Sequence, residues 1–167
     1  MALIIEDGSN VAGANSYVDL ADCRTYALAR GVTLTAVDAD LEVFLIKAND
    51  YLESFRDKFK GSRTNDDDQP LQWPRSLVYI DSILFDEDSI PQLLIDAQCQ
   101  LAIEQTNGFD FSPTFDGGFV VLEQVGPIVQ KYSERIRTST VPKMSTFDAL
   151  INPLVRVGAG VGGTLRV

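Results

Sequence analysis

Hydrophobic residues between positions 41 and 59 recur at intervals of three and four, which is the spacing of one face of an α-helix. Most charged side chains of the same stretch lie off that stripe. The pattern predicts a long amphipathic helix that begins near Asp38, a good N-cap, and runs to about Lys58. Its apolar face comprises Leu41, Phe44, Leu45, Ala48, Leu52, Phe55 and Phe59.

Two further stretches have helical spacing. The first predicts a helix over Leu20–Arg30, with Asp19 as its N-cap and Gly31 in the left-handed conformation that commonly follows a helix end. The second begins at Pro91, because a proline is tolerated in a first helical turn, and ends before Gly108.

The last third of the chain predicts shorter elements. Residues 119–134, FVVLEQVGPIVQKYSE, predict two short strands that turn at Gly126-Pro127, and a flexible hairpin arm is equally compatible with them. A short helix is expected to start at Ser145, with Asp148 as an acidic variant of a capping box. The segment Leu77–Asp88 is ambiguous between helix and strand.

These elements predict a mainly α fold, a small bundle of three to four helices with a short β-hairpin. The helical domain is expected to span residues 1–154, with the hairpin inserted near residues 119–133, and an extended arm is expected over residues 155–167. A chain of 167 residues fits one domain of ordinary size. It has no run of about 18 apolar residues, so no membrane span is expected. The opening MALIIEDGSN lacks the basic flank of a signal peptide, so synthesis in the cytoplasm is expected.

The final thirteen residues, VRVGAGVGGTLRV, contain four glycines, which is too many for a stable helix. They also keep isolated aliphatic side chains, whereas a free terminus is usually polar and frayed. Either the segment is a disordered tail or it folds only against a neighbouring molecule. The glycines at 158, 160 and 163 match a dinucleotide fingerprint only formally, because no helix can follow within the four residues that remain.

Residue usage excludes much catalytic chemistry. The chain has no histidine and two cysteines, which removes Ser-His-Asp and Cys-His pairs, most zinc sites and any four-thiolate cluster. The run Asp66–Asp68 lacks the alternating ligands and turn glycine of a calcium loop and is read as a solvated acidic loop. No catalytic, cofactor or metal residue is assigned, and a non-enzyme is expected. Cys23 and Cys99 are expected to be buried free thiols, with a bridge left open.

The net charge of −10 is unevenly distributed. Residues 76–130 contain nine carboxylates and no lysine or arginine, whereas residues 131–167 contain six basic and two acidic side chains. A protein that grips nucleic acid through its phosphates needs a clustered basic surface. The charge distribution therefore argues against strong DNA affinity of the isolated chain.

The stretch Leu71–Arg75, LQWPR, holds the only tryptophan. A residue before proline is pushed towards an extended backbone. Trp73, Pro74 and Arg75 are interpreted as an anchor that fixes the long acidic loop to the domain, with Arg75 paired to a carboxylate. An aromatic side chain beside an arginine could instead stack on the bases of single-stranded DNA. The aspartates at 66–68 would repel phosphates, which favours the anchor.

Several of these stretches occur in an order that resembles a known family. They are ANSYVDLADCRTYALARG, ANDYLESF, LQWPR, IPQLLIDAQCQLA and VGPIVQKYSE, and the resemblance that they carry covers nearly the whole chain. The order is similar to that of the head–tail connector, or adaptor, proteins of tailed phages, a family that also carries the label DnaT-like single-stranded DNA-binding protein. The most specific elements are Tyr17–Gly31 and Trp73–Arg75.

The resemblance implies a structural virion protein of the phage neck. Such an adaptor forms a ring, typically of twelve copies, beneath the portal protein, joins the capsid to a tail-side neck or tail-completion protein, and surrounds double-stranded DNA that passes without tight binding. Its C-terminal extension reaches the portal, which gives this role to Val155, Arg156, Val157, Gly158, Val161, Leu165, Arg166 and Val167. The alternative is a DnaT-like single-stranded DNA-binding protein acting in replication, in which Trp73, Arg75 and the basic C-terminal segment touch DNA. The net charge favours the connector.

Overall fold

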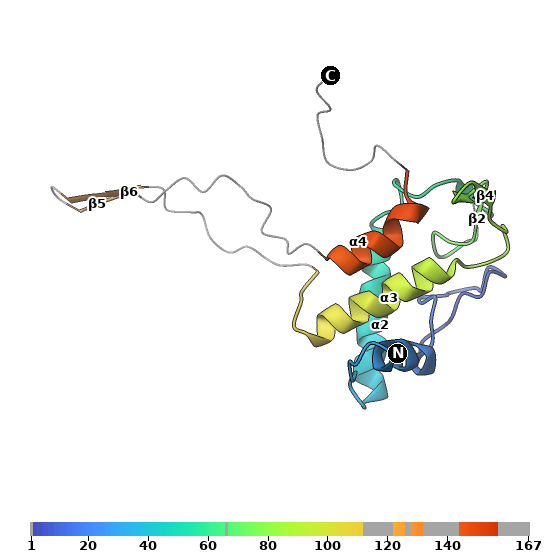
Figure 1. Ribbon diagram of the computed structural model, residues 1–167, viewed down its shortest axis with the longest axis horizontal. Helices are drawn as coiled ribbons and strands as arrows, with labels where there is room; N and C mark the ends of the chain where they lie inside the picture. The colour runs from blue at the N-terminus through green and yellow to red at the C-terminus, as the bar shows by residue number, and fades with distance from the viewer. Residues whose placement is uncertain (1, 66, 112–121, 126–127, 132–143, 157–167) are drawn as a thin grey trace, which may run out of the picture. The chain divides into compact units, whose positions relative to one another are not determined.

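The computed structural model describes residues 2–65, 67–111, 122–125, 128–131 and 144–156 (Figure 1). The chain divides into two compact units, Met1–Phe109 with Ser145–Val167, and Asp110–Met144. The predicted mainly α class is confirmed, because helices form most of the regular structure in the first unit. These helices are α1 (Leu20–Leu28), α2 (Asp38–Glu53), α3 (Gln92–Thr106), α4 (Ser145–Ile151) and the 3-10 turn η1 (Asn152–Leu154).

The described strands form three antiparallel pairs. In the first unit, β1 (Ser62–Arg63) pairs with β2 (Arg75–Ser76), and β3 (Tyr79–Ile80) pairs with β4 (Ile83–Leu84). The second unit contains β5 (Leu122–Val125) and β6 (Ile128–Lys131), in the register Leu122 to Lys131 and Val125 to Ile128. The hairpin predicted near residues 119–133 is therefore confirmed. The ambiguous stretch after Ser76 is also a hairpin.

Helix α1 follows its sequence signals. The Asp19 side chain accepts a hydrogen bond from the backbone N–H of Asp22 at 2.7 Å, as an N-cap should, and Gly31 has a φ of +74°.

Helix α2 departs from the prediction at both ends. Asp38 lies in its first turn, where it pairs with Arg24 at 2.7 Å, and Val37 is the N-cap without a side-chain bond. The helix ends at Glu53 rather than near Lys58. The Ser54 hydroxyl donates to the Tyr51 carbonyl at 2.6 Å, and residues 54–58 continue as turns.

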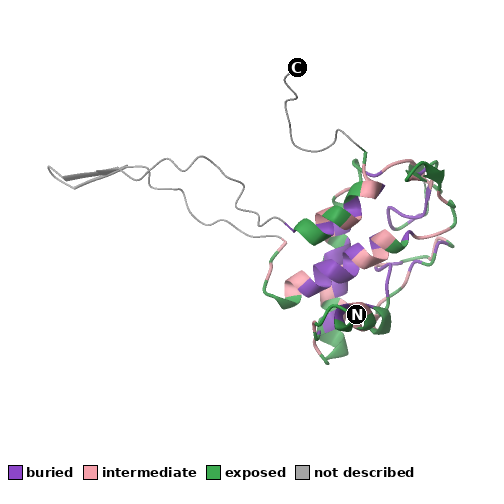
Figure 2. Cartoon of the chain, viewed as in Figure 1, coloured by how far each residue is buried: buried purple, intermediate pink, exposed green. Residues whose placement is uncertain are grey.

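The core lies where α1, α2 and α3 pack together (Figure 2). Leu41 and Leu45 of α2 meet Ala102 of α3 there, all fully buried. Both cysteines are free and buried in this core, which confirms the expectation of buried thiols. Helix α4 packs against α3, and the ring of its Phe147 lies 5.6 Å from that of Tyr51 on α2.

Buried polar contacts fix the N-terminal segment to the core. The Gln98 side chain on α3 donates to the carbonyl of Leu45 and to the Ser16 hydroxyl, both at 2.9 Å, and accepts from the Tyr17 backbone N–H at 2.9 Å. These bonds satisfy a fully buried amide and connect three separate stretches. No helix in the described part of the chain is long and apolar enough to cross a membrane.

Candidate functional site

The end of the described C-terminal segment returns to the chain that follows α2. Phe59 and Val155 form an antiparallel bridge, with the Lys60 N–H donating to the Leu154 carbonyl at 3.0 Å and the Arg156 N–H donating to the Lys58 carbonyl at 2.8 Å. The first two residues of the predicted arm, Val155 and Arg156, are therefore held on the helical unit. The other predicted arm residues, Val157, Gly158, Val161, Leu165, Arg166 and Val167, lie outside the described residues.

Arg75 is the most constrained charged side chain near this bridge, with an exposed fraction of 5%. Its Nε donates to the Lys60 carbonyl at 2.8 Å and its Nη2 to the Gly61 carbonyl at 3.0 Å. Its Nη1 donates to the carbonyl and to the side-chain oxygen of Gln72, both at 3.2 Å. The expectation that Arg75 pairs with a carboxylate is wrong, since all four acceptors are carbonyl oxygens.

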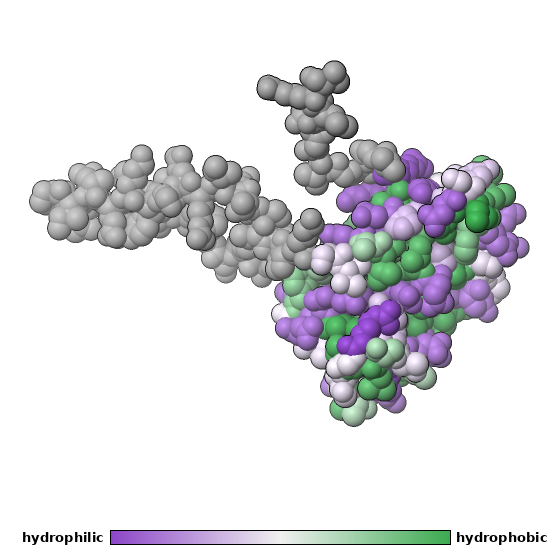
Figure 3. Space-filling view, in the orientation of Figure 1, coloured by the Kyte–Doolittle hydropathy of each residue, from purple (hydrophilic) through white to green (hydrophobic). Residues whose placement is uncertain are grey.

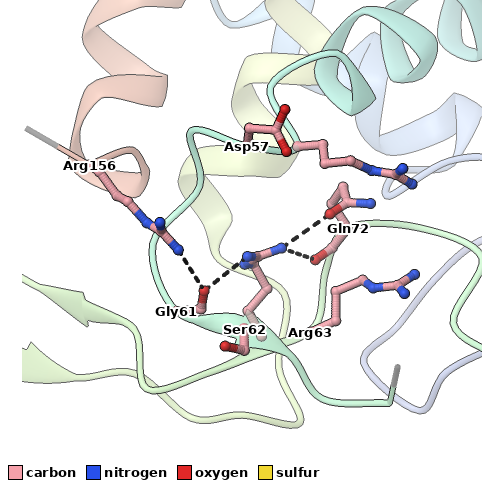
Figure 4. A pocket seen from close by; sticks show the side chains of 8 residues that line it. Asp57, Gly61, Ser62, Arg63, Gln72 and Arg156 are labelled. Carbon is pink, nitrogen blue, oxygen red and sulfur yellow. Dashed lines mark hydrogen bonds between the residues drawn. The ribbon is translucent and has the colours of Figure 1, made fainter. Parts of the chain in front are cut away.

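Four arginines line one hollow of about 410 Å³ beside this bridge (Figure 4). Arg156 donates to the Gly61 carbonyl at 3.4 Å, the same oxygen that Arg75 uses. A single carboxylate, that of Asp57, is in the lining. The lining residues are Arg56, Asp57, Gly61, Ser62, Arg63, Gln72, Arg75 and Arg156.

Like charges are crowded in this arginine hollow. Burial lowers the pKa of Arg75, and the neighbouring charge of Arg156 lowers it further. A guanidinium nevertheless stays protonated at neutral pH. The repulsion between these two groups is a cost that a bound anion would offset, so the hollow is suited to phosphate or carboxylate groups.

The loop between β1 and β2 holds two sides of the hollow together. The Gln69 side chain donates to the Pro74 carbonyl at 2.9 Å, and Arg63 donates to the Gln69 carbonyl at 3.1 Å. The backbone at Gly61 is equally constrained, because a Cβ at this position would lie 2.1 Å from the Ser76 carbonyl oxygen. A glycine is therefore required where the two arginines share their acceptor.

The structure places Trp73 in the core rather than on the surface. Its exposed fraction is 0%, and its ring meets those of Phe59 and Phe85 edge to face, at centroid distances of 5.9 and 6.4 Å. A fully buried ring cannot stack on a nucleic-acid base. Trp73 lies two residues before Arg75, so the packing of its ring in the core fixes the loop that carries Arg75.

A half-buried carboxylate, that of Glu53, positions the same loop. The Tyr17 hydroxyl donates to Glu53 Oε1 at 2.9 Å and accepts from the Trp73 N–H at 3.2 Å, while the Gln72 N–H donates to the same Oε1 at 3.1 Å. Burial raises the pKa of Glu53 and raises that of Tyr17 well above its usual range. The network fixes residues 72–73 to the end of α2.

The rest of the described surface offers less to a ligand. A second hollow, of about 660 Å³, includes Asp7, Asn10 and Asp88 in its lining and no cation. Within the described ranges, no group of three or more His, Cys, Asp or Glu side chains could hold a metal ion. The arginine hollow therefore differs from the second hollow in that its lining concentrates positive charge.

Sequence reasoning found only part of this site. It selected Arg75 and Arg156, but for separate roles, and it missed Arg56 and Arg63. The four arginines follow no periodic spacing, and Arg156 is 81 positions beyond Arg75 in the chain. The available signal was weak, namely a clustering of arginines on both sides of a loop otherwise rich in aspartate.

One comparison with known proteins gives a match over the full chain. The family model described as "Putative DnaT-like ssDNA binding protein" matches residues 1–167. No curated protein and no solved structure matches the chain.

Proposed function

The chain belongs to this DnaT-like family, and from that premise we propose that it binds single-stranded DNA through the arginine hollow. The supporting observation is that four arginines and one carboxylate residue line the same hollow, in a chain whose net charge is −10. Guanidinium groups present planar pairs of donors that match phosphate oxygens.

Three of the four arginines have distinct roles in this proposal. Arg75 is held by four hydrogen bonds and supplies fixed positive charge at the base of the hollow. Arg56 and Arg156 are exposed, so their guanidinium groups can turn towards a phosphodiester without breaking the fold. Contacts of this kind position a nucleic acid and carry no sequence information.

The proposed binding is moderate and sensitive to salt. Carboxylates elsewhere on the molecule repel a polyanion, and the buried Trp73 supplies no stacking platform. Phosphate contacts alone give dissociation constants of roughly 10⁻⁴–10⁻⁶ M at physiological salt. We therefore expect affinity in that range, without base preference.

Fluorescence anisotropy with a labelled oligothymidylate of about 20 nucleotides tests the proposal at low salt. The double variant Arg56→Gln/Arg156→Gln is expected to lose about tenfold or more in affinity. Arg30→Gln is the matched control, because Arg30 is also exposed but stacks on Tyr26 at the end of α1, away from the lining residues. Equal affinity of the double variant and the control contradicts the proposal.

A second proposal is the virion connector that the resemblance implies. The net charge of −10 favours it, because carboxylates facing a channel would keep DNA moving. It predicts ring particles with the portal protein and no retention of oligonucleotide at any salt concentration. A chain ending at Arg156, which keeps the bridge between Phe59 and Val155, should then remain folded and fail to join the portal. Head–tail joining by that truncated chain contradicts the connector role.

A further inference from the structure

The β3–β4 hairpin exposes an unusual amount of apolar surface. Of the eight large hydrophobic residues that are exposed in the described part of the chain, three lie within this hairpin and a fourth, Leu77, lies two residues before it. Figure 3 shows hydrophobic side chains on the side of the molecule where Figure 1 labels β4. The four residues are Leu77, Tyr79, Ile83 and Leu84, with exposed fractions of 70%, 53%, 73% and 56%.

The hairpin is attached firmly to the core despite this exposure. Val78 is fully buried, and its carbonyl accepts from the Phe85 N–H at 2.8 Å. The ring of Phe85 packs against buried Trp73. Asp81 and Ser82 both have positive φ angles, 50° and 70°, which is the conformation of a tight two-residue hairpin turn. The apolar side chains are therefore presented on a rigid element.

The backbone of β4 has an open edge. Val78 and Phe85 form a hydrogen-bonded pair, so the next pair, Tyr79 and Leu84, directs its N–H and C=O groups away from the ladder. On the outer edge of β3, the Lys60 Nζ donates a hydrogen bond to the Tyr79 carbonyl at 3.2 Å. Among the described residues, β4 pairs with β3 alone, and no second strand lies on its other edge. An extended segment could add to this edge.

The charge around the hairpin indicates what such a segment carries. Asp81, Asp86, Glu87 and Asp88 are exposed within or directly after it, and the chain has no lysine or arginine from residue 76 to residue 130. An acidic border disfavours nucleic acid and favours basic side chains. Exposed apolar patches rimmed by polar residues are typical of protein interaction sites.

We propose that the β3–β4 hairpin is a docking surface for an extended protein segment that combines aliphatic side chains with arginine or lysine. The segment adds along the β4 edge, its aliphatic residues cover Ile83 and Leu84, and its cations meet the acidic border. This surface shares no residue with the lining of the arginine hollow, and its exposed apolar and acidic side chains favour a protein partner over DNA.

A peptide with this chemistry can be taken from the chain's own sequence. Residues 155–167 contain two arginines, several aliphatic residues and no carboxylate. The probe is that peptide with a fluorophore, and its matched partner carries Arg156→Glu and Arg166→Glu. The full-length protein is expected to bind the arginine peptide at least about tenfold more tightly than the glutamate peptide at low salt.

Paired substitutions locate the binding. Ile83→Ser/Leu84→Ser is expected to weaken the arginine peptide by about tenfold or more, whereas the control Leu28→Ser/Val43→Ser, two exposed apolar residues on α1 and α2, leaves the affinity within about twofold. No binding up to roughly 1 mM peptide overturns the proposal, as does binding that survives the hairpin substitutions. A third result would also contradict the proposal. If the peptide does not bind, and the full chain forms a dimer that the hairpin substitutions abolish, the hairpin pairs with the hairpin of a second copy.

Discussion

The arginine hollow and the β3–β4 hairpin are opposite in every physical respect. The hollow is concave, polar and basic, whereas the hairpin is exposed, apolar and bordered by carboxylates. The hollow combines residues up to 100 positions apart, Arg56 and Arg156, while the hairpin consists of the six consecutive residues from Tyr79 to Leu84. A change in long-range packing should therefore damage the hollow more than it damages the hairpin.

The strongest test of that difference is Trp73→Ala. Removing a fully buried tryptophan ring is expected to lower the free energy of unfolding by about 3–5 kcal/mol and to abolish oligonucleotide binding, because the ring supports the Arg75 loop. Tyr79→Ala, on the exposed hairpin, should change it by less than about 1 kcal/mol. Urea unfolding measures both. Similar losses for the two variants contradict the contrast.

A smaller loss is expected for Arg75→Gln, which removes the guanidinium donor from the Lys60 carbonyl and from the carbonyl of buried Gln72. An unpaired buried acceptor costs about 1–3 kcal/mol. Arg75→Lys should restore the charge but little of the stability, since an ammonium cannot reach these acceptors with the geometry of a planar fork. Full recovery of the unfolding midpoint by the lysine variant would show that charge alone matters here.

Two glycines sharpen the comparison further. Gly61 and Gly31 have similar φ angles, +66° and +74°, but only at Gly61 would a Cβ meet another backbone, the Ser76 carbonyl. Gly31→Ala should cost about 1 kcal/mol from the left-handed conformation alone. Gly61→Ala should cost more and weaken oligonucleotide binding as well. Equal thermal shifts for the two variants contradict the close packing inferred at Gly61.

The smallest expected effect is a pH dependence at Glu53. Burial disfavours the charged form of this carboxyl and so raises its pKa in the folded protein. The free-energy cost of burying the charge is present at neutral pH. It is relieved as the pH falls through the raised pKa towards the unfolded value of 4.5. Glu53→Gln keeps an acceptor for Tyr17 and Gln72 and removes the charge. Relative to wild type, the variant should therefore be more favourable at neutral pH than near pH 5. A difference in unfolding free energy that does not change with pH contradicts this cause.

Local signals predicted local structure well. The side chain of Asp19 and the glycine at 31 marked both ends of α1, and the two strands predicted before and after residues 126–127 are present as β5 and β6. The end of α2 was predicted too late, because Phe55 and Phe59 continue the apolar spacing although they pack as part of a turn and a bridge. Periodicity reports which residues are buried and not which backbone buries them.

The candidate site required tertiary information. Nothing in the sequence near Arg156 indicates that its backbone pairs with Lys58, or that it shares the Gly61 carbonyl with Arg75. The burial of Trp73 also depends on tertiary contacts. Phe59 and Phe85, which are distant in the sequence, pack against its ring and leave no exposed face for stacking on a base. Net charge was also a poor guide, because it averages over a local concentration of arginine.

The proposed DNA site is tested most directly by measuring oligothymidylate affinity as a function of salt for wild type and Arg156→Gln. Each phosphate contact with single-stranded DNA contributes about −0.7 to the slope of log affinity against log salt. We predict a slope of about −2 for wild type, and a slope shallower by roughly 0.7 when Arg156 is replaced. An identical slope for the two proteins, or no binding at low salt, contradicts a phosphate site at the arginine hollow.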